Sequence, residues 1–319
     1  MTKKNFNQRI PLLVIAGPTA VGKSELALQV AEQLQTEIIS ADSAQVYRYM
    51  DIGTAKPTAE EQNRIKHHLI DLVDPDQPFS VADYQQAANK IIKKLWSAKR
   101  LPLMVGGTGL YIRAVTNAYA FGRRGADYST RENYEQDALR FGLRYLYQKL
   151  QDLDPETACK IHPNDQKRII RALEVYSLEG KPISEQVTQT RMNESPFKTL
   201  LFGLTINRVA LYERIENRVE KMLEKGFLEE VRSLRNKGFG EAAPGMQILG
   251  YRQLLAYLEG SEGWEDTVAA IKKETRNLAK RQLTWFRREK EIIWIDVKES
   301  TAPEEIAKNI CKIVKDLAP

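Results

Sequence analysis

The chain has 319 residues, a formal net charge of +6, 42% hydrophobic residues and 28% charged residues. This length and composition are typical of one large globular domain with an insertion, or of two domains, and the basic balance only weakly favours a polyanionic partner. Cys159 and Cys311 show no metal-ligand or paired spacing, which excludes a zinc site and a disulfide framework. Because no run of about eighteen apolar residues occurs, we expect no membrane span, no signal peptide and a cytoplasmic location.

Near the N-terminus, one stretch fits the spacing G-x-x-x-x-G-K-[ST] of a phosphate-binding loop. Residues 12–16 before it are typical of a buried strand, and residues 24–34 after it of an amphipathic helix. The glycines let the backbone wrap around an anion, the helix start adds its positive dipole end, Lys23 supplies charge and Ser24 a hydroxyl for Mg²⁺. The pattern therefore predicts a di- or triphosphate site. Its residues are Gly17, Pro18, Thr19, Ala20, Val21, Gly22, Lys23 and Ser24.

The loop after the next predicted strand should lie at the same edge of the sheet. Residues 37–40 are typical of this strand, and a strand, a helix and a second strand form a right-handed crossover that brings both carboxyl ends together. Asp42 follows the strand, so we expect it beside a bound phosphate. From spacing alone, an Asx turn or a helix N-cap is an equally good interpretation of Asp42.

A short apolar run at residues 69–73 is predicted as a further strand. The pair His67 and His68 precedes it. We interpret these histidines as structural, because no carboxylate or cysteine stands nearby at the spacing of a metal site.

A second glycine-rich turn, Gly-Gly-Thr-Gly-Leu-Tyr, occupies residues 106–111. It follows a predicted strand at residues 101–105 and opens a helix, so it too should lie at the carboxyl edge of the sheet. Glycines at this edge suggest that a ligand approaches the backbone closely.

Between residues 121 and 196 the alternation of strands and helices gives way to a helical pattern. We interpret this segment as an all-helical insertion domain in an α/β core with a parallel sheet, formed by residues 1–120 and 197–319. Its helices are predicted at residues 133–150, 154–161 and 165–179.

The last helix of the insertion has Asn164 as its expected N-cap. It carries Lys167, Arg168 and Arg171 among apolar residues. From the pattern alone, a solvated face is a better interpretation of these charges than contacts to a phosphate backbone.

The core is predicted to resume with a strand at residues 200–206 and a helix at residues 209–225. Arg214 and Arg218 lie one turn apart on that helix. Either they grip a pyrophosphate or they form ion pairs within the helix. The candidate partners are Glu213, Glu216 and Glu220.

A long helix is predicted at residues 264–291, and its basic side chains recur at steps of three and four. Such a stripe suits an extended polyanion. The stripe consists of Lys273, Arg276, Lys280, Thr284 and Arg287.

A phosphate loop is typical of kinases and other nucleotide-binding enzymes, so a small-molecule kinase is one candidate. A hydrolase or motor would need an apolar strand ending in an acidic residue that holds Mg²⁺, and no such strand stands out. The acid at the phosphate edge, the second glycine-rich turn and the basic helices together favour a diphosphate substrate that meets a nucleic acid.

Seven motifs, in order through nearly the whole chain, resemble the tRNA dimethylallyltransferase (tRNA isopentenyltransferase) family in its bacterial form. They are the phosphate loop, Asp-Ser-Ala-Gln-Val-Tyr at 42, Asp-Ile-Gly-Thr-Ala-Lys-Pro at 51, Gly-Gly-Thr-Gly-Leu-Tyr at 106, Ile-His-Pro-Asn-Asp at 161, Gly-Tyr-Arg at 250 and Lys-Arg-Gln-Leu-Thr-Trp-Phe-Arg at 280.

This resemblance implies transfer of a dimethylallyl group from dimethylallyl diphosphate to the exocyclic N6 amine of the adenosine just 3′ of the anticodon, in tRNAs that read codons beginning with U. The phosphate loop would hold the pyrophosphate leaving group with Mg²⁺ near Ser24, and Arg218 would be a further diphosphate ligand. Asp42 is the family's candidate base, and Lys23 and Thr108 complete the implied catalytic group. We expect a monomer.

The resemblance also implies tRNA contacts along both parts of the chain. Gln247 departs from the pattern of some relatives, which have arginine there. The implied contacts are Asp42, Ser43, Ala44, Gln45, Thr108, Arg131, Lys167, Arg168, Ile169, Ile170, Arg171, Gln247, Gly250, Tyr251, Arg252, Lys280, Arg281 and Arg287.

Overall fold

The structure is a computed structural model that describes residues 9–117, 119, 128–185, 188, 194–297 and 302–315. The chain divides into two compact units. The first consists of Met1–Ile112 and Pro196–Pro319, and the second of Arg113–Ser195. The insertion boundary predicted at residue 121 lies outside the described residues.

The first unit is built on a six-stranded sheet in the order β3-β2-β4-β1-β5-β6, in which every neighbouring pair is parallel. This arrangement confirms the predicted α/β class. Its strands are β1 (Ile10–Ala16), β2 (Ile38–Ala41), β3 (His67–His68), β4 (Leu103–Gly106), β5 (Phe197–Thr205) and β6 (Ile293–Asp296).

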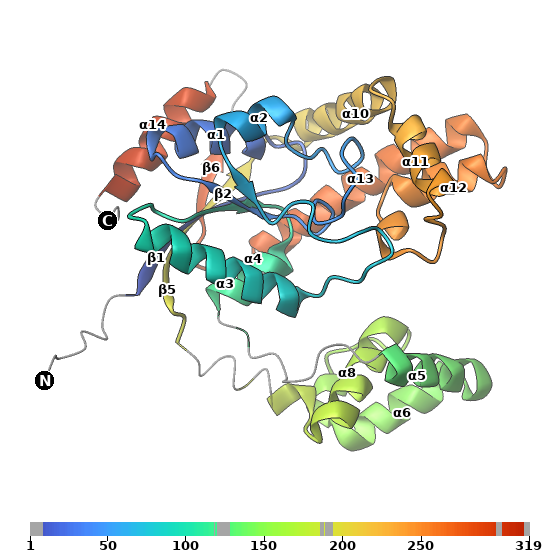
Figure 1. Cartoon of the computed structure of the whole chain (residues 1–319). Coiled ribbons are helices and arrows are strands. Elements are labelled where there is room, and N and C mark those ends of the chain that lie inside the picture. The colour runs from blue at the N-terminus through green and yellow to red at the C-terminus, as the bar shows by residue number, and fades with distance from the viewer. Residues whose placement is uncertain are drawn as a thin grey trace, which may run out of the picture. The chain divides into compact units, whose positions relative to one another are not determined.

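Helices cover both faces of the sheet, with α1 and α14 on one face and α3 and α4 on the other (Figure 1). The helices of this unit are α1 (Lys23–Gln33), α2 (Ala59–Arg64), α3 (Val81–Ser97), α10 (Arg208–Glu224), α11 (Phe227–Asn236), the 3₁₀ helix η1 (Pro244–Gln247), α12 (Tyr251–Leu258), α13 (Trp264–Phe286) and α14 (Pro303–Val314), and α4 (Gly109–Thr116) runs into the second unit.

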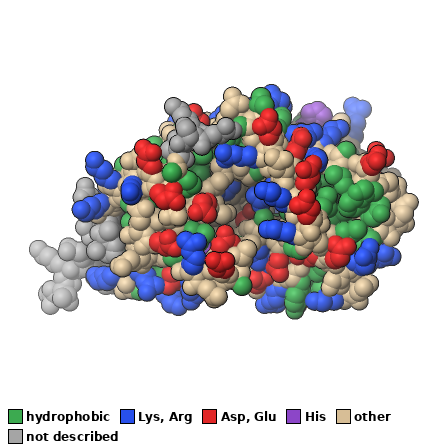
Figure 2. Space-filling model, turned by 90° about the horizontal axis from the view of Figure 1, so that it is seen from above, with side chains coloured by type: hydrophobic (Ala, Val, Ile, Leu, Met, Phe, Trp, Pro, Cys, Tyr) green, Lys and Arg blue, Asp and Glu red, His purple; other side chains and the backbone are tan. Residues whose placement is uncertain are grey.

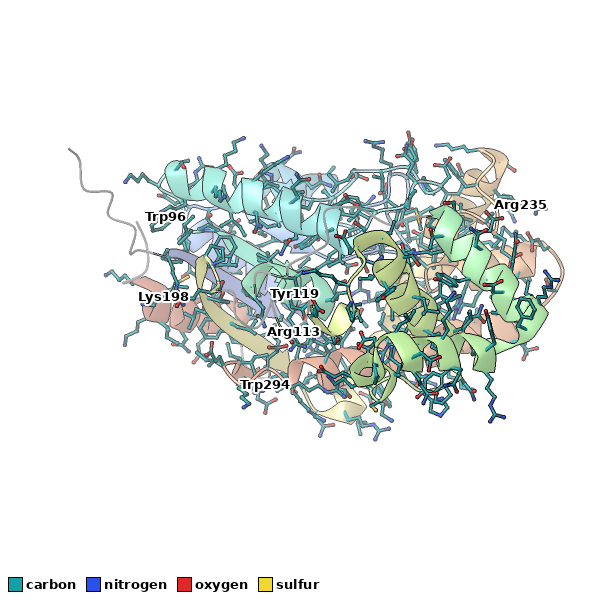
Figure 3. The ribbon with its side chains drawn as sticks, turned by 90° about the horizontal axis from the view of Figure 1, so that it is seen from below. Trp96, Arg113, Tyr119, Lys198, Arg235 and Trp294 are labelled. Atoms are coloured by element: carbon teal, nitrogen blue, oxygen red, sulfur yellow. The ribbon has the colours of Figure 1, made fainter. Side chains whose placement is uncertain are left out.

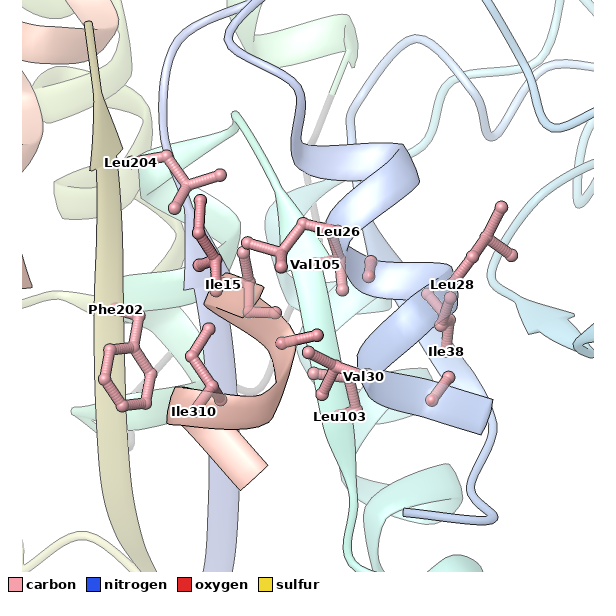
Figure 4. Close-up of a cluster of buried hydrophobic side chains, with 14 of the residues drawn as sticks. Ile15, Leu26, Leu28, Val30, Ile38, Leu103, Val105, Phe202, Leu204 and Ile310 are labelled. Carbon is pink, nitrogen blue, oxygen red and sulfur yellow. The ribbon is translucent and has the colours of Figure 1, made fainter. Parts of the chain in front are cut away.

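The main core lies between the sheet and the helices α1 and α14. A parallel sheet that is covered on both faces needs continuous apolar strands, and Leu12–Ala16 of β1 are accordingly all buried. Leu26 and Val30 of α1 and Ile310 of α14 pack against strand side chains such as Ile15 and Leu103 (Figure 4). This packing fixes the helix that follows the phosphate loop.

The edge strand β6 is more exposed than β1, and its Trp294 is visible among the side chains in the view from below (Figure 3). No helix of the described part is long and apolar enough to cross a membrane.

The described residues of the second unit form only helices. Tyr134, Leu146, Ile169 and Leu173 are among the buried residues of its own small core. Its helices are α5 (Tyr128–Phe141), α6 (Leu143–Leu153), α7 (Pro155–Ala158) and α8 (Gln166–Glu179).

Two predictions for this unit are wrong. The helix predicted at residues 133–150 is broken into α5 and α6, because Gly142 takes a positive φ of 82° that a continuing helix does not allow. The N-cap of α8 is Asp165 rather than Asn164, since the Asp165 carboxylate accepts the backbone N–H of Arg168.

Two predictions for the first unit also need correction, and two helices were missed. Residues 69–73 form no strand, because Leu69 and Asp71 have positive φ values of 63° and 54°. Helix α13 ends at Phe286, five residues before the predicted end at 291, and the chain then turns into β6. The helices α11 and α12 were not predicted from the sequence.

The motif at residues 51–56 has a structural role, and its Thr54 and Lys56 are buried. The Glu230 carboxylate of α11 accepts the N–H groups of Asp51 and Ile52 at 2.8 Å and of Gly53 at 3.1 Å, as well as the Tyr251 hydroxyl at 2.6 Å. A single carboxylate therefore ties this loop to α11 and α12.

Replacing Glu230 with glutamine should lower the free energy of unfolding by about 2–3 kcal/mol. An amide has only one acceptor oxygen. Its NH₂ group would replace the other carboxylate oxygen, so the protein N–H or O–H groups that donate to that oxygen would lose their acceptor. Urea unfolding measures the effect. The matched control is Glu229→Gln, which changes an exposed neighbour and should alter the free energy of unfolding by less than about 0.5 kcal/mol. Equal stability of the two variants would show that the Glu230 contacts contribute little.

Candidate active site at the carboxyl edge of the sheet

The strand register brings three loops together at the carboxyl edge. Ala16 of β1 and Ala41 of β2 both lie opposite Gly106 of β4. The phosphate loop, Asp42 and the second glycine-rich turn each follow directly. The predicted meeting of these loops at one edge is confirmed.

The phosphate loop has the backbone of an anion-binding concavity. Gly22 has φ 101° and caps α1, and Ala20 has φ 63°, a conformation that non-glycine residues rarely adopt. Within the described residues, the N–H groups from Ala20 to Ser24 have no hydrogen-bond acceptor. A row of unpaired donors at a helix N-terminus is suited to phosphate oxygens.

Three charged side chains from different elements share this site. Lys23 starts α1 and its Nζ donates to the Pro18 carbonyl at 2.6 Å across the loop. Burial, together with the positive charge of Arg218, lowers the pKa of Lys23 from 10.5 to about 7, while Asp42 raises it. Burial also lowers the pKa of Arg218, and Asp42 again opposes this. The site therefore holds two desolvated cations that an anion would stabilise.

The affinity for inorganic pyrophosphate should fall as the pH rises above 7. Without a bound anion, Lys23 loses its proton near that pH, whereas a bound anion favours the charged ammonium, so binding above pH 7 takes up a proton. The dissociation constant, measured by titration calorimetry, should rise about tenfold per pH unit on this account.

The control for this prediction is Lys23→Arg, because a guanidinium stays charged over the same range. The dissociation constant of the wild type is divided by that of Lys23→Arg at each pH, which cancels the effect of the titration of pyrophosphate itself. A ratio that is independent of pH would mean that Lys23 stays fully charged even without a bound anion.

Asp42 combines both interpretations that its position allowed. Its Oδ1 accepts the Ala44 N–H at 2.9 Å, which is an Asx turn. Its charge also acts on both Lys23 and Arg218, so the carboxylate belongs to the phosphate site. The turn fixes the side chain, and the second oxygen, Oδ2, has no hydrogen bond in the described structure.

Thr108 connects the second glycine-rich turn to the Asp42 loop. Its N–H donates to the Ala41 carbonyl at 3.0 Å, and its Oγ1 accepts the Ser43 N–H at 3.0 Å. Gln45 connects the same loop to β2 and to the segment at residue 55. Its Oε1 accepts the Ser40 hydroxyl at 2.8 Å, and its Nε2 donates to the Ala55 carbonyl at 3.2 Å. Asp42, Ser43, Ala44, Gln45 and Thr108 therefore form one hydrogen-bonded unit.

The glycines of the second turn make room for the protein itself, which corrects the expectation that a ligand approaches them. A Cβ at Gly106 would lie 2.1 Å from the Ala41 oxygen, and one at Gly107 would lie 2.4 Å from Nε2 of Gln282. A Cβ at Gly109 would lie 2.2 Å from the Trp285 ring. Helix α13 thus packs directly on this turn.

Gln282 is a site residue that sequence reasoning missed. Its Oε1 accepts the Thr19 N–H at 2.9 Å, and its Nε2 donates to the Gly107 carbonyl at 3.1 Å. The only signal in the sequence was an amide within the basic motif of α13, which by itself does not distinguish a contact to the loop from a contact to a ligand.

Basic residues predicted to face tRNA on the first unit fall into two groups. Lys280 and Arg281 of α13 and Arg287, which caps its C-terminus, are exposed and form no ion pair within the described residues. Arg252, in contrast, pairs with Glu274. On the face shown in Figure 2, basic and acidic side chains are interspersed rather than gathered in one patch.

The basic stripe predicted on α13 is interrupted by ion pairs. Arg276 contacts Glu216 of α10 at 2.5 Å, and Lys272 beside the stripe contacts Glu220 at 2.7 Å. The other basic residues of the stripe, Lys273, Lys280 and Arg287, are exposed and have no ion pair within the described residues. Arg276 therefore holds α10 and α13 together.

Two further predicted contacts have structural roles. Tyr251 is buried, and its hydroxyl donates to Glu230. Gly250 has φ 93°, and its N–H donates to Gln253. Gln247 is exposed and its amide donates to the Glu241 carbonyl at 2.6 Å.

In the second unit, Arg131 and Arg171 both contact Glu174 at 2.8 Å. Glu174 is fully buried, so these two arginines neutralise an internal charge, and the tRNA contact implied for them stays a prediction. Ile169 and Ile170 are buried core residues of α8, although Ile170 also lines an open groove, and the tRNA contact implied for them stays a prediction.

An open groove of about 810 Å³ lies on the second unit. Lys167 is exposed on it, and Arg168 is exposed nearby and paired with Asp165 at 3.3 Å. Its lining residues are Arg131, Glu135, His162, Asn164, Asp165, Gln166, Lys167, Ile170 and Arg171.

The histidines at the start of the predicted strand are structural. His67 and His68 form β3, the Nδ1 of His67 lies 2.8 Å from the Ile65 carbonyl, and His68 lies 2.5 Å from Glu37. Within the described residues, no group of three histidine, cysteine, aspartate or glutamate side chains could hold a metal ion.

Comparison with known proteins gives close relatives over the whole chain. The family described as IPP transferase matches residues 45–289. The tRNA dimethylallyltransferase of Pelotomaculum thermopropionicum is 48% identical over 308 residues, covering 96% of this chain and 97% of that protein. The tRNA dimethylallyltransferase of Natranaerobius thermophilus is 46% identical over 315 residues, covering 98% and 94%.

Solved structures agree with this result. The tRNA isopentenylpyrophosphate transferase of Bacillus halodurans matches with a TM-score of 0.71 at 40% identity, covering 96% of this chain and 97% of that one. A eukaryotic dimethylallyltransferase, solved acting on tRNA, matches with a TM-score of 0.83 at 29% identity, covering 96% and 79%. These matches confirm the phosphate-loop fold and do not support the small-molecule kinase. The chain therefore belongs to the IPP transferase family.

Proposed function

We propose that this enzyme transfers a dimethylallyl group from dimethylallyl diphosphate to the exocyclic N6 amine of the adenosine just 3′ of the anticodon, in tRNAs that read codons beginning with U. Relatives that share nearly the whole chain are named for this activity. The observation that carries the proposal is that three loops meet at the carboxyl edge of the sheet, where the charge of Asp42 acts on Lys23 of the phosphate loop and on Arg218 of α10.

The phosphate loop would hold the diphosphate leaving group. As the allylic C–O bond breaks, its electron pair goes to the diphosphate, and the negative charge that develops is stabilised by Lys23, Arg218 and the unpaired loop N–H groups. The allylic carbon becomes the electrophile. The loop N–H groups from Ala20 to Ser24 have no other acceptor in the described structure, whereas the Lys23 Nζ would have to turn from the Pro18 carbonyl to the diphosphate.

Asp42 would accept the proton of the attacking amine. The lone pair of an adenine amine is delocalised, so the amine attacks efficiently only when its proton is removed as the N–C bond forms. The Asx turn orients the Asp42 carboxylate, and the Oδ2 atom is the one left for this proton. Thr108 holds the same loop, because its Oγ1 accepts the Ser43 N–H next to Asp42.

Mg²⁺ fits this site as an ion shared with the substrate. Ser24 is exposed on the first turn of α1, and its hydroxyl has no hydrogen bond within the described residues. Mg²⁺ commonly takes one or two protein ligands together with phosphate oxygens and water, which agrees with a single hydroxyl here. When bound, the ion would neutralise charge on the diphosphate.

The adenosine would have to leave its stack to reach Asp42, as in other enzymes that modify a base. Lys280, Arg281 and Arg287 are exposed and unpaired in the described structure, so they are the best candidates on the first unit for phosphate contacts. Lys167 is the corresponding candidate on the second unit.

The test is incubation of the purified protein with labelled dimethylallyl diphosphate, Mg²⁺ and unmodified tRNA. A parallel reaction contains ATP in place of the prenyl donor. Label in the RNA of the first reaction supports prenyl transfer. ATP consumption in the second reaction, together with no label in the RNA of the first, would instead support the small-molecule kinase interpretation.

A further inference from the structure

The Gln282 amide bridges two loops of the active site that are far apart in the sequence. It accepts the Thr19 N–H of the phosphate loop and donates to the Gly107 carbonyl of the second glycine-rich turn. Both hydrogen bonds have ordinary lengths, 2.9 Å and 3.1 Å, and they use both ends of one rigid planar group.

The phosphate loop has few other protein contacts of this kind. Its N–H groups from Ala20 to Ser24 are unpaired in the described structure, and Pro18 has no N–H. Ala20 and Gly22 also take left-handed conformations that a free loop would leave easily. A contact at Thr19 from outside the loop therefore restrains the part of the backbone where the loop begins.

The absence of a side chain at Gly107 leaves room for the Gln282 amide. A Cβ at this position would lie 2.4 Å from the Gln282 Nε2, so any residue other than glycine would displace the amide. The same turn carries Thr108, whose Oγ1 accepts the Ser43 N–H beside Asp42. The amide thus links the loop for the diphosphate to the loop that carries the candidate base.

We propose that Gln282 is a positioning residue that fixes the phosphate loop in its diphosphate-binding conformation by tying it to the second glycine-rich turn. It acts through Thr19 and Gly107 and touches no substrate. This role differs from the tRNA contact that the resemblance implies for the surrounding motif. The inference rests on the proposed function only in that a diphosphate occupies the loop.

The test separates the two substrates of the site. In Gln282→Leu, the affinity for inorganic pyrophosphate with Mg²⁺, measured by titration calorimetry, should fall about tenfold, which is the effect of losing one to two hydrogen bonds. The affinity for unmodified tRNA, measured by filter binding, should stay within about twofold. Asn277→Ala removes an exposed amide from the same helix and should change neither value.

A second variant reaches the same contact from the other side. Gly107→Ala keeps Gln282 but pushes its amide away, so it should weaken pyrophosphate binding by a similar factor. The double variant Gly107→Ala with Gln282→Leu should be no weaker than either single variant, because both remove one bridge. If Gln282→Leu folds poorly, Gly107→Ala alone still tests the bridge, because it keeps Gln282 and displaces only its amide.

Loss of tRNA affinity with unchanged pyrophosphate affinity in Gln282→Leu would overturn the proposal and make Gln282 an RNA contact. Additive effects in the double variant would also overturn it. Pyrophosphate binding does not require prenyl transfer. The proposed role of Gln282 can therefore be tested independently of the proposed function. Failure of the labelled prenyl assay with normal pyrophosphate results would reject the function alone.

Discussion

Replacing Asp42 with asparagine should lower the rate of prenyl transfer by about 10²- to 10⁴-fold, the range expected for loss of a general base. Asparagine keeps the oxygen that accepts the Ala44 N–H, so the Asx turn survives. It cannot take a proton from the adenine amine. Single-turnover transfer of labelled prenyl group to tRNA measures the effect directly.

This variant separates the two interpretations of Asp42. If the carboxylate only forms the Asx turn, asparagine should react at the wild-type rate and alanine should be the slower of the two. If it is the base, both variants lose turnover. The affinity for tRNA should not decrease in either case, because removing a negative charge does not repel RNA.

The parts of the fold that the sequence predicted well have local signals. A buried strand, a glycine loop and an amphipathic helix follow one another between Ile10 and Gln33, and each has a pattern that its own residues determine. The crossover rule then places Asp42 beside the loop without further information. The register of β1, β2 and β4 agrees with this placement.

The parts that could not be predicted depend on partners far away in the chain. Thr19 and Gln282 are separated by 263 residues, and Arg131 and Glu174 by 43. A single sequence shows that Arg131 is basic and that Glu174 is acidic, but it does not show that both are turned to each other in a core. The same limit explains why glycines at 106, 107 and 109 suggested a ligand and proved to accommodate protein atoms.

The sequence pattern also could not show which charged side chains have an ion-pair partner in the folded protein. Glu216 and Glu220 of α10 were candidate partners for Arg218, yet the structure pairs them with Arg276 and Lys272 of α13. Arg218 is consequently left without a hydrogen bond or ion pair within the described residues. The alternative in which Arg218 forms ion pairs within its own helix is therefore wrong.

Replacing Arg218 with methionine should lower kcat/KM for prenyl transfer by about 10²- to 10³-fold, as expected for loss of one donor to a developing anion. It should at the same time leave the protein as stable as before or stabilise it slightly, because a desolvated cation without an ion-pair partner in the described residues costs free energy. Arg218 also lowers the pKa of Lys23, so the pH above which pyrophosphate binding weakens should move upward from about 7.

The matched control is Arg214→Met, one turn earlier on the same helix, which should change neither activity nor the pH dependence. Arg218→Lys tests geometry, because lysine keeps the charge but lacks the planar fork that contacts two phosphate oxygens. It should recover only part of the activity. Urea unfolding of all three variants separates a role of Arg218 in binding from a role in folding. A loss of stability in Arg218→Met would show that Arg218 supports the core. Lost activity with unchanged or higher stability would show that the charge of Arg218 serves to bind the diphosphate.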